Sequence, residues 1–179
     1  MELMEAILGR RSVRKYKNEQ VRQEDLQTIL EAARWAPSWA NTQCVEYVVV
    51  RDPELKAALA DTLPDMNPAR KAMGQVPLII AALGKLEKSG FRREMQLTAL
   101  GDWYMLDIGL AVANLTLTAH SLGYGTVHVG LLDHLKAGEI LGVPDDYRVV
   151  ELIPLGVPDD TPVAPPRRPL EEIVHDDKF

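Results

Sequence analysis

The 179-residue sequence has one cysteine, more acidic than basic residues and no long uncharged apolar run. The lone cysteine, Cys44, excludes an intrachain disulfide and a zinc or iron–sulfur site built only from cysteines. Its 20 Lys and Arg against 26 Asp and Glu give a net charge of −6, which is unfavourable for general binding to nucleic-acid phosphates. No apolar run approaches the roughly 20 residues needed to span a bilayer. We therefore expect neither a nucleic-acid partner nor a membrane partner.

Common catalytic and targeting signatures are also missing. The sequence has no GxxxxGK[ST], HExxH or GxSxG motif, and its four histidines are spread too widely to predict a metal site. The acidic start, Met1–Glu5, lacks the positive charge of a secretory signal peptide. With 46% hydrophobic residues, the chain can build one sizeable core. We expect a single cytoplasmic domain over residues 1–179.

Hydrophobic periodicity and turn residues predict a mixture of helices and strands. The expected helices cover residues 4–8, 24–36, 53–63, 102–122 and 135–141. The expected strands cover residues 45–50, 78–83, 126–129 and 149–155. The helix over 102–122 is apolar on nearly all sides, which predicts a place at the centre of the domain. Prolines interrupt residues 64–75, and residues 85–94 are expected to form a loop.

The end of the sequence is rich in proline. Six of the 12 prolines lie between Pro154 and Pro169. This composition favours extended backbone at about 3.1 Å per residue, so ten residues can cross roughly 30 Å. We therefore predict an extended C-terminal arm over residues 154–179.

Two cationic groups stand out in this acidic chain. Arg or Lys occupies five of the eight positions in residues 10–17. Arginine forks around a serine hydroxyl, as in the segment 11–14, are suited to clamp a phosphate. The alternative interpretation is a solvated run of charges. Arg167 and Arg168 form the second group, for which the alternative is a surface tail.

Uncharged polar side chains gather just past the second predicted helix, in the segment after Pro37. Ser38, Asn41 and Gln43 offer hydrogen-bond donors and acceptors that can read the edge of a heterocycle. A loop that hydrogen-bonds only to itself is the alternative. The residues alone leave both interpretations open.

Five segments, taken in order, resemble those of the nitroreductase family of flavin-dependent oxidoreductases. They are RRSVRKY at 10–16, AARWAPSWANTQ at 32–43, DIGLAVANL at 107–115, the glycines 123, 125 and 130, and PPRRPLEEIV at 165–174. The resemblance covers nearly the whole chain. It implies an α+β sandwich in which helices flank a mostly antiparallel sheet. It also implies a homodimer with FMN at the subunit interface and a domain-swapped C-terminal arm.

The resemblance implies roles for individual residues at the phosphate end of the cofactor. Arg10, Arg11 and Ser12 would hold the phosphate and ribityl end of FMN. Arg167 or Arg168 would complete the phosphate clamp.

Around the flavin ring, the resemblance implies contacts from both subunits. Arg14 would lie beside the pyrimidine side and give electrostatic support to the negative charge of reduced flavin. The backbone at Val129 and Gly130 would lie near the reactive nitrogen. The other subunit would supply Pro37, Ser38, Asn41 and Gln43. No catalytic side chain and no metal ligand are expected, because FMN carries the chemistry.

The activity implied by the resemblance is hydride transfer from NAD(P)H, through FMN, to small conjugated acceptors such as nitroaromatics and quinones. The expected mechanism is ping-pong. Two alternatives stay open. One is specialised flavin chemistry, such as flavin cleavage, dehalogenation or ring dehydrogenation, and the other is a non-catalytic flavin-binding protein. Residues 64–95 match no subgroup signature, so the resemblance assigns no particular acceptor.

Overall fold

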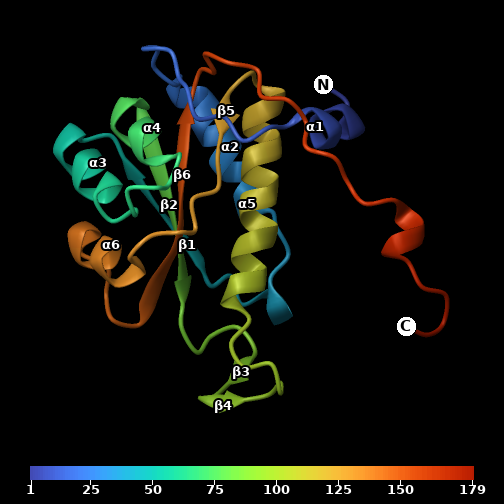
Figure 1. Ribbon diagram of the computed structural model, residues 1–179. Helices are drawn as coiled ribbons and strands as arrows, with labels where there is room; N and C mark the ends of the chain where they lie inside the picture. Colours follow the sequence, from blue (N-terminus) through green and yellow to red (C-terminus); the bar gives the residue numbers. More distant parts are fainter.

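A four-stranded antiparallel sheet forms the middle of the molecule in the computed structural model, which describes residues 1–179 (Figure 1). Its strands lie in the order β1 (Val45–Val50), β2 (Leu78–Lys85), β6 (Tyr147–Gly156) and β5 (Gly125–Thr126). Each strand is antiparallel to its neighbour. Beyond β5, Ser12 adds a parallel bridge to Thr126. The sheet therefore has β1 at one edge and the segment around Ser12 at the other.

Helices cover both faces of this sheet. One face packs against α2 (Gln23–Arg34) and α5 (Tyr104–Ser121). The other face packs against α3 (Pro53–Ala60), α4 (Arg70–Gln75) and α6 (His134–Leu141). β2 is apolar along its length because both of its faces are covered, with Ile79 and Ile80 in opposite cores. The predicted arrangement of helices around an antiparallel sheet is confirmed.

The predicted bounds of one strand and the predicted start of one helix are correct. β1 has the predicted bounds, 45–50. Asp52 caps α3 by accepting hydrogen bonds from the amides of Glu54 and Leu55, both at 2.9 Å. α3 ends at Ala60 rather than at Leu63.

The structure corrects three expectations about short elements. Residues 70–75 form α4, since Pro64 and Pro68 precede this helix and do not interrupt it. The expected loop over 85–94 contains the start of a small hairpin of β3 (Phe91–Arg92) and β4 (Met95–Gln96). The expected strand over 126–129 is reduced to β5 and one bridge between Val129 and Leu152.

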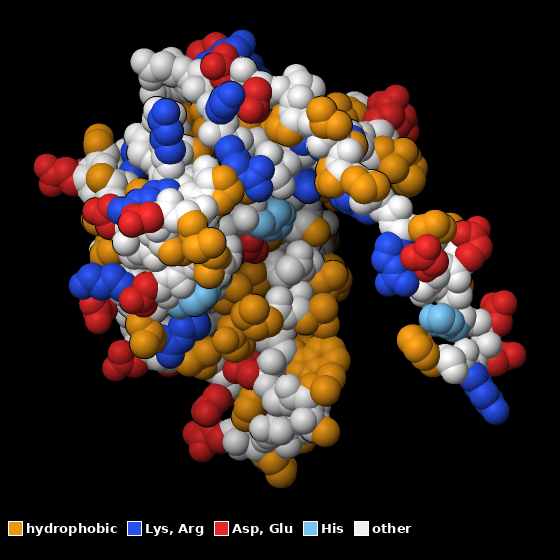
Figure 2. All heavy atoms as spheres, in the orientation of Figure 1, with side chains coloured by type: hydrophobic (Ala, Val, Ile, Leu, Met, Phe, Trp, Pro, Cys, Tyr) orange, Lys and Arg blue, Asp and Glu red, His pale blue; other side chains and the backbone are white.

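The predicted central position of the long helix is wrong for the single chain. α5 lies on one face of the sheet, and its outward side exposes Met105, Leu106 and Leu110 at 56%, 48% and 38%. The first helix, α1 (Leu3–Gly9), packs near α5 and exposes further apolar side chains at residues 3, 4, 7 and 8. Figure 2 shows hydrophobic side chains gathered over these two helices.

The C-terminal arm is extended beyond β6, and β6 itself contains residues 154–156 of the predicted arm. After β6 the chain forms no strand or helix until the single turn η2 (Leu170–Glu172). Residues 163–179 are all exposed. Figure 1 shows the arm passing α1 and then leaving the body of the molecule. None of the helices, α5 included, combines the length and apolarity required to cross a membrane.

Candidate functional site

The basic segment after α1 is fixed to the edge of the sheet. The Val13 amide donates to the Thr126 carbonyl at 2.9 Å, next to the bridge made by Ser12. The Val13 side chain is buried over Gly125, where a Cβ would come within 2.8 Å of it. Side chains alternate along an extended segment, so Ser12 and Arg14 face away from the core.

Arginines from this segment and from the arm meet in one cleft. A hollow of about 290 Å³ is lined by Arg10, Arg11, Ser12, Arg14 and Arg167. It adjoins a hollow of about 270 Å³ that shares Arg10 and Arg11. It also adjoins a hollow of about 520 Å³ that shares Ser12 and Arg14. We call these three hollows together the arginine cleft.

The cations of the arginine cleft have no carboxylate partners. Arg11 Nη1, Arg14 Nη1 and Arg167 Nη1 donate to main-chain carbonyls at 2.6, 3.3 and 3.0 Å. Arg10 Nη1 is buried and has no hydrogen-bond partner. Burial, together with the nearby Arg11 and Arg167, lowers the pKa of Arg10. A buried, unpaired guanidinium nitrogen among further cations is a site for an anion.

His120, at the end of α5, lies beside these arginines. It lines the hollow that contains Arg10 and Arg11. Burial and the positive charges of Arg10 and Arg11 lower the pKa of His120. The imidazole therefore adds no positive charge to the cleft near neutral pH.

The two arginines of the arm have different surroundings. Arg167 lines the cleft. Arg168 instead pairs with Glu172, with its Nε 3.0 Å from the carboxylate, and also donates to the Glu172 carbonyl. The structure thus brings Arg167, and not Arg168, to the other arginines.

Sequence reasoning missed two cleft residues on α4. Lys71 and Gln75 line the widest hollow together with Ser12 and Arg14. Lys71 adds a cation to a hollow that Arg167 does not line. The missed helix explains the omission, because these residues face the cleft only when 70–75 are helical.

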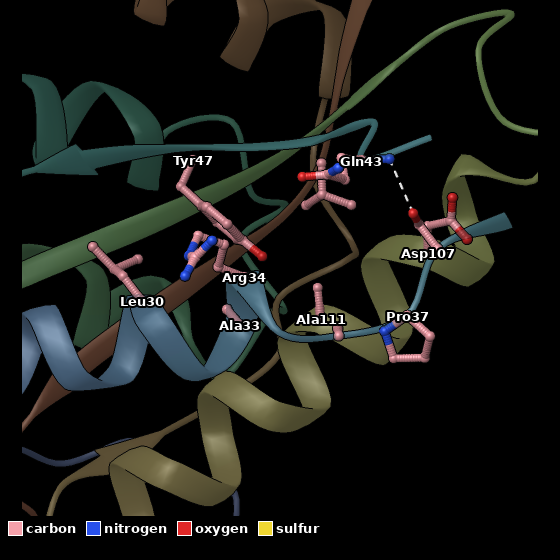
Figure 3. A pocket seen from close by; sticks show the side chains of 11 residues that line it. Leu30, Ala33, Arg34, Pro37, Gln43, Tyr47, Asp107 and Ala111 are labelled. Atoms are coloured by element: carbon pink, nitrogen blue, oxygen red, sulfur yellow. Dashed lines mark hydrogen bonds between the residues drawn. The ribbon is translucent and has the colours of Figure 1, made fainter. Parts of the chain in front are cut away.

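The loop after α2 is held in an unusual conformation. It contains the short turn η1 (Trp39–Asn41), and Ala40, Asn41 and Gln43 have φ of 46°, 55° and 50°. Left-handed backbone at non-glycine residues costs on the order of 1–3 kcal/mol and clusters at functional sites. The Ser38 hydroxyl stabilises the loop by accepting from the Gln43 amide at 2.9 Å (Figure 3).

Asp107 is a third residue whose role the sequence did not reveal. Its carboxylate is 1% exposed and accepts hydrogen bonds from the Trp39 amide at 2.9 Å and the Ser89 hydroxyl at 2.7 Å. It also accepts from the Cys44 thiol at 3.2 Å. Burial and this hydrogen bond raise the pKa of Cys44 to about 12, so the thiol is unreactive. Asp107 therefore positions the loop from the long helix.

The loop residues line a different cavity from the arginines. Pro37, Ser38 and Gln43 border a cavity of about 310 Å³ whose wall includes Tyr47 and Arg34 (Figure 3). Asn41 is exposed and lies outside that wall. The loop leads into β1, whereas the arginine segment borders β5. Four strand spacings of about 4.8 Å separate these edges by roughly 20 Å, so one chain does not unite the two groups.

Val129 and Gly130 do not line the arginine cleft. Val129 is buried and exchanges two 3.0 Å backbone hydrogen bonds with Leu152. Gly130 is exposed, and its amide makes no backbone hydrogen bond. The Gly130 amide is thus a free donor.

Comparisons with known proteins point to one family. The model of the Nitroreductase family matches residues 7–157. A protein of Archaeoglobus fulgidus, provisionally named NADH dehydrogenase/NAD(P)H nitroreductase, is 34% identical over 89% of this chain and 87% of its own.

Two solved structures share the fold, both at lower sequence identity than the Archaeoglobus protein. A nitroreductase family protein of Clostridium novyi NT has a TM-score of 0.80 at 32% identity, covering 89% of this chain and 87% of its own. The NADPH:FMN oxidoreductase of Vibrio harveyi, solved in complex with NAD+, has a TM-score of 0.85 at 26% identity. That match covers 99% of this chain and 77% of the Vibrio chain.

Proposed function

Since the chain belongs to the nitroreductase family and is an FMN-dependent oxidoreductase that uses NAD(P)H, we propose that it reduces small conjugated acceptors as a homodimer with shared flavin sites. The acceptors are nitroaromatics and quinones. The mechanism is ping-pong, in which NAD(P)H and then the acceptor bind to the same site. The observation that carries the proposal is the arginine cleft, with its buried and unpaired Arg10 Nη1.

The phosphate end of the cofactor fits the arginine cleft. Arg10, Arg11 and Arg167 offer guanidinium forks that no carboxylate occupies. A phosphate dianion would satisfy the buried Arg10 Nη1, which has no partner of its own. Ser12 would add a hydroxyl at the same place. In this proposal, Arg168 holds the arm by its pair with Glu172 and does not bind phosphate.

The ring end of the cofactor would lie toward Arg14 and Lys71. Bound FMN would supply hydride transfer, and the chain's own residues supply orientation and charge. Arg14 and Lys71 both line the wide hollow. With the ring there, the two cations would lie where hydride transfer adds negative charge. Gly130 lies outside the three hollows, and in this proposal its free amide would donate to the edge of a ring that extends beyond them.

The second half of each site would come from the partner subunit. Ser38, Asn41 and Gln43 lie across the sheet from the arginines of their own chain, so a second copy must bring such a loop to the cleft. The exposed apolar sides of α5 and α1 support the dimer interface. The extended arm, exposed from residue 163 onward, supports a crossing to the partner.

We expect the purified protein to be yellow and to contain non-covalent FMN rather than FAD. Several arginines converge on one cleft, and no dinucleotide fingerprint is present to hold an adenylate. Cofactor released by acid should co-migrate with FMN on chromatography, and the protein should oxidise NAD(P)H when nitroaromatics or quinones are added. Release of FAD, or failure of the apoprotein to take up excess FMN, would contradict the proposal.

A further inference from the structure

Asp160 presents an unsatisfied acceptor inside the arginine cleft. It lies near the start of the arm, and it lines the hollows of about 270 and 520 Å³. Its Oδ1 is buried and has no hydrogen-bond partner. Arg10 Nη1, another buried atom without a partner, lines one of the same hollows. A buried acceptor and a buried donor of opposite charge therefore border one space without bonding to each other.

The backbone fixes Asp160 in this place. Tyr16 and Pro158 form an antiparallel bridge, and the Lys17 amide donates to the Val157 carbonyl at 2.9 Å. The Asp159 amide donates to the Lys15 carbonyl at 3.0 Å. The first residues of the arm are thus tied to the basic segment, before the arm leaves the body. The position of the carboxylate is set by these bonds and not by the free part of the arm.

The unpaired groups specify the chemistry of their ligand. A phosphate ester accepts hydrogen bonds from Arg10 but, when fully ionised, has no proton to donate to a carboxylate. A carboxylate beside a phosphate repels it unless another ligand group lies between them. A hydroxyl next to the phosphate is such a group, because it donates to the carboxylate. The two unpaired atoms therefore match a polyol phosphate better than a phosphate alone.

We propose that Asp160 accepts a hydrogen bond from a hydroxyl of the ribityl chain and so determines specificity for the polyol part of the cofactor. This proposal rests on FMN occupying the arginine cleft. It gives the cleft two separate functions, since the arginines bind the phosphate while Asp160 recognises the sugar alcohol beside it.

The test is a titration of apoprotein with three flavins, followed by flavin fluorescence. FMN has ribityl and phosphate, riboflavin has ribityl alone, and lumiflavin has neither. Because a hydrogen bond to a charged group is involved, Asp160→Ala should weaken FMN and riboflavin binding by about tenfold or more. Lumiflavin binding should change by less than about twofold, because no ribityl hydroxyl is present.

Two further variants complete the design. Asp160→Asn keeps an acceptor oxygen without the charge, so its loss of FMN affinity should lie between those of wild type and Asp160→Ala. Asp145→Ala removes the same charge from an exposed side chain that lines none of the three hollows, and its FMN affinity should stay near wild type. Asp160→Ala protein that binds FMN as tightly as wild type, or more tightly, would overturn the proposal, since a carboxylate that only repels phosphate gives that result. Wild-type apoprotein that binds no FMN would instead refute the proposed function itself.

Discussion

Truncation before Pro158 is expected to give a protein that neither dimerises stably nor retains flavin. The deletion removes Arg167 and Asp160 from the cleft and the exposed apolar side chains of the arm. Stable homodimer interfaces commonly bury more than about 2,000 Å², and an extended arm adds area at little cost in chain length. Each lost charged hydrogen bond is worth roughly 1.5–3 kcal/mol, so flavin affinity should fall at least about tenfold. Light scattering and flavin content, measured on intact and truncated protein, give the result.

The chain offers matched controls for this truncation. Removal of residues 175–179 alone leaves η2 and both arm arginines in place, and should preserve the dimer and its flavin. Arg167→Ala should weaken flavin binding, while Arg168→Ala should have the smaller effect, because Arg168 is engaged by Glu172. An intact protein that is monomeric and holds flavin at full occupancy would contradict the shared-site account.

Arg14→Ala is expected to weaken flavin binding and also to slow reduction by NAD(P)H at saturating FMN. Arg14 is exposed, and its Nη1 makes one long hydrogen bond of 3.3 Å to the Ser12 carbonyl, so the cation is available to a ligand. A cation placed where negative charge develops stabilises the transition state as well as the complex. The loss should be roughly 1.5–3 kcal/mol, or about 10- to 150-fold in rate. Stopped-flow reduction of the flavin-saturated variant measures it.

Two further variants show whether the effect of Arg14→Ala comes from the loss of its positive charge at that position. Arg14→Lys keeps the charge and should recover most of the reduction rate but not all of the affinity. Lys17→Ala removes a nearby cation whose nearest acidic partner is Glu19 at 4.0 Å, and should leave the reduction rate unchanged. If Arg14→Ala alters affinity alone, with a wild-type reduction rate at full occupancy, Arg14 only binds the cofactor.

Local patterns in the sequence account for the elements that were predicted correctly. The β-branched run of β1 and the cap and proline before α3 act over a few neighbouring residues, so they identify their elements without the rest of the fold. α4 lacks such signals and is held by the core contacts of Ala72 and Met73. The hairpin β3–β4 turns at Arg93 and Glu94, which have φ of 50° and 65°, a conformation that Asn and Gly usually signal. The long helix was placed too deep, because apolar composition does not distinguish a side that faces the core from an apolar side that is exposed in the single chain.

In the candidate site, too, some features can be recognised from local sequence and others only from the fold. The basic segment and the polar loop are visible in the sequence because chemically similar residues are adjacent. Asp107 is not, because its donors at Trp39, Cys44 and Ser89 are distant in sequence and meet only in the fold. The difference between the two arm arginines arises from the pair of Arg168 with Glu172, whereas Arg167 donates to the Pro165 carbonyl and lines the cleft.

Subunit complementation tests the central claim, that each flavin site combines the arginine cleft of one chain with the loop of the other. One variant, Arg10→Ala, breaks the cleft, and a second, Ser38→Ala with Asn41→Ala, breaks the loop. In a heterodimer purified through two different tags, one site contains both defects and the other contains neither. The account predicts that this heterodimer binds FMN and oxidises NAD(P)H at about half the wild-type level per dimer, although each parent homodimer is defective. A heterodimer as defective as its parents would show that each chain builds its site alone.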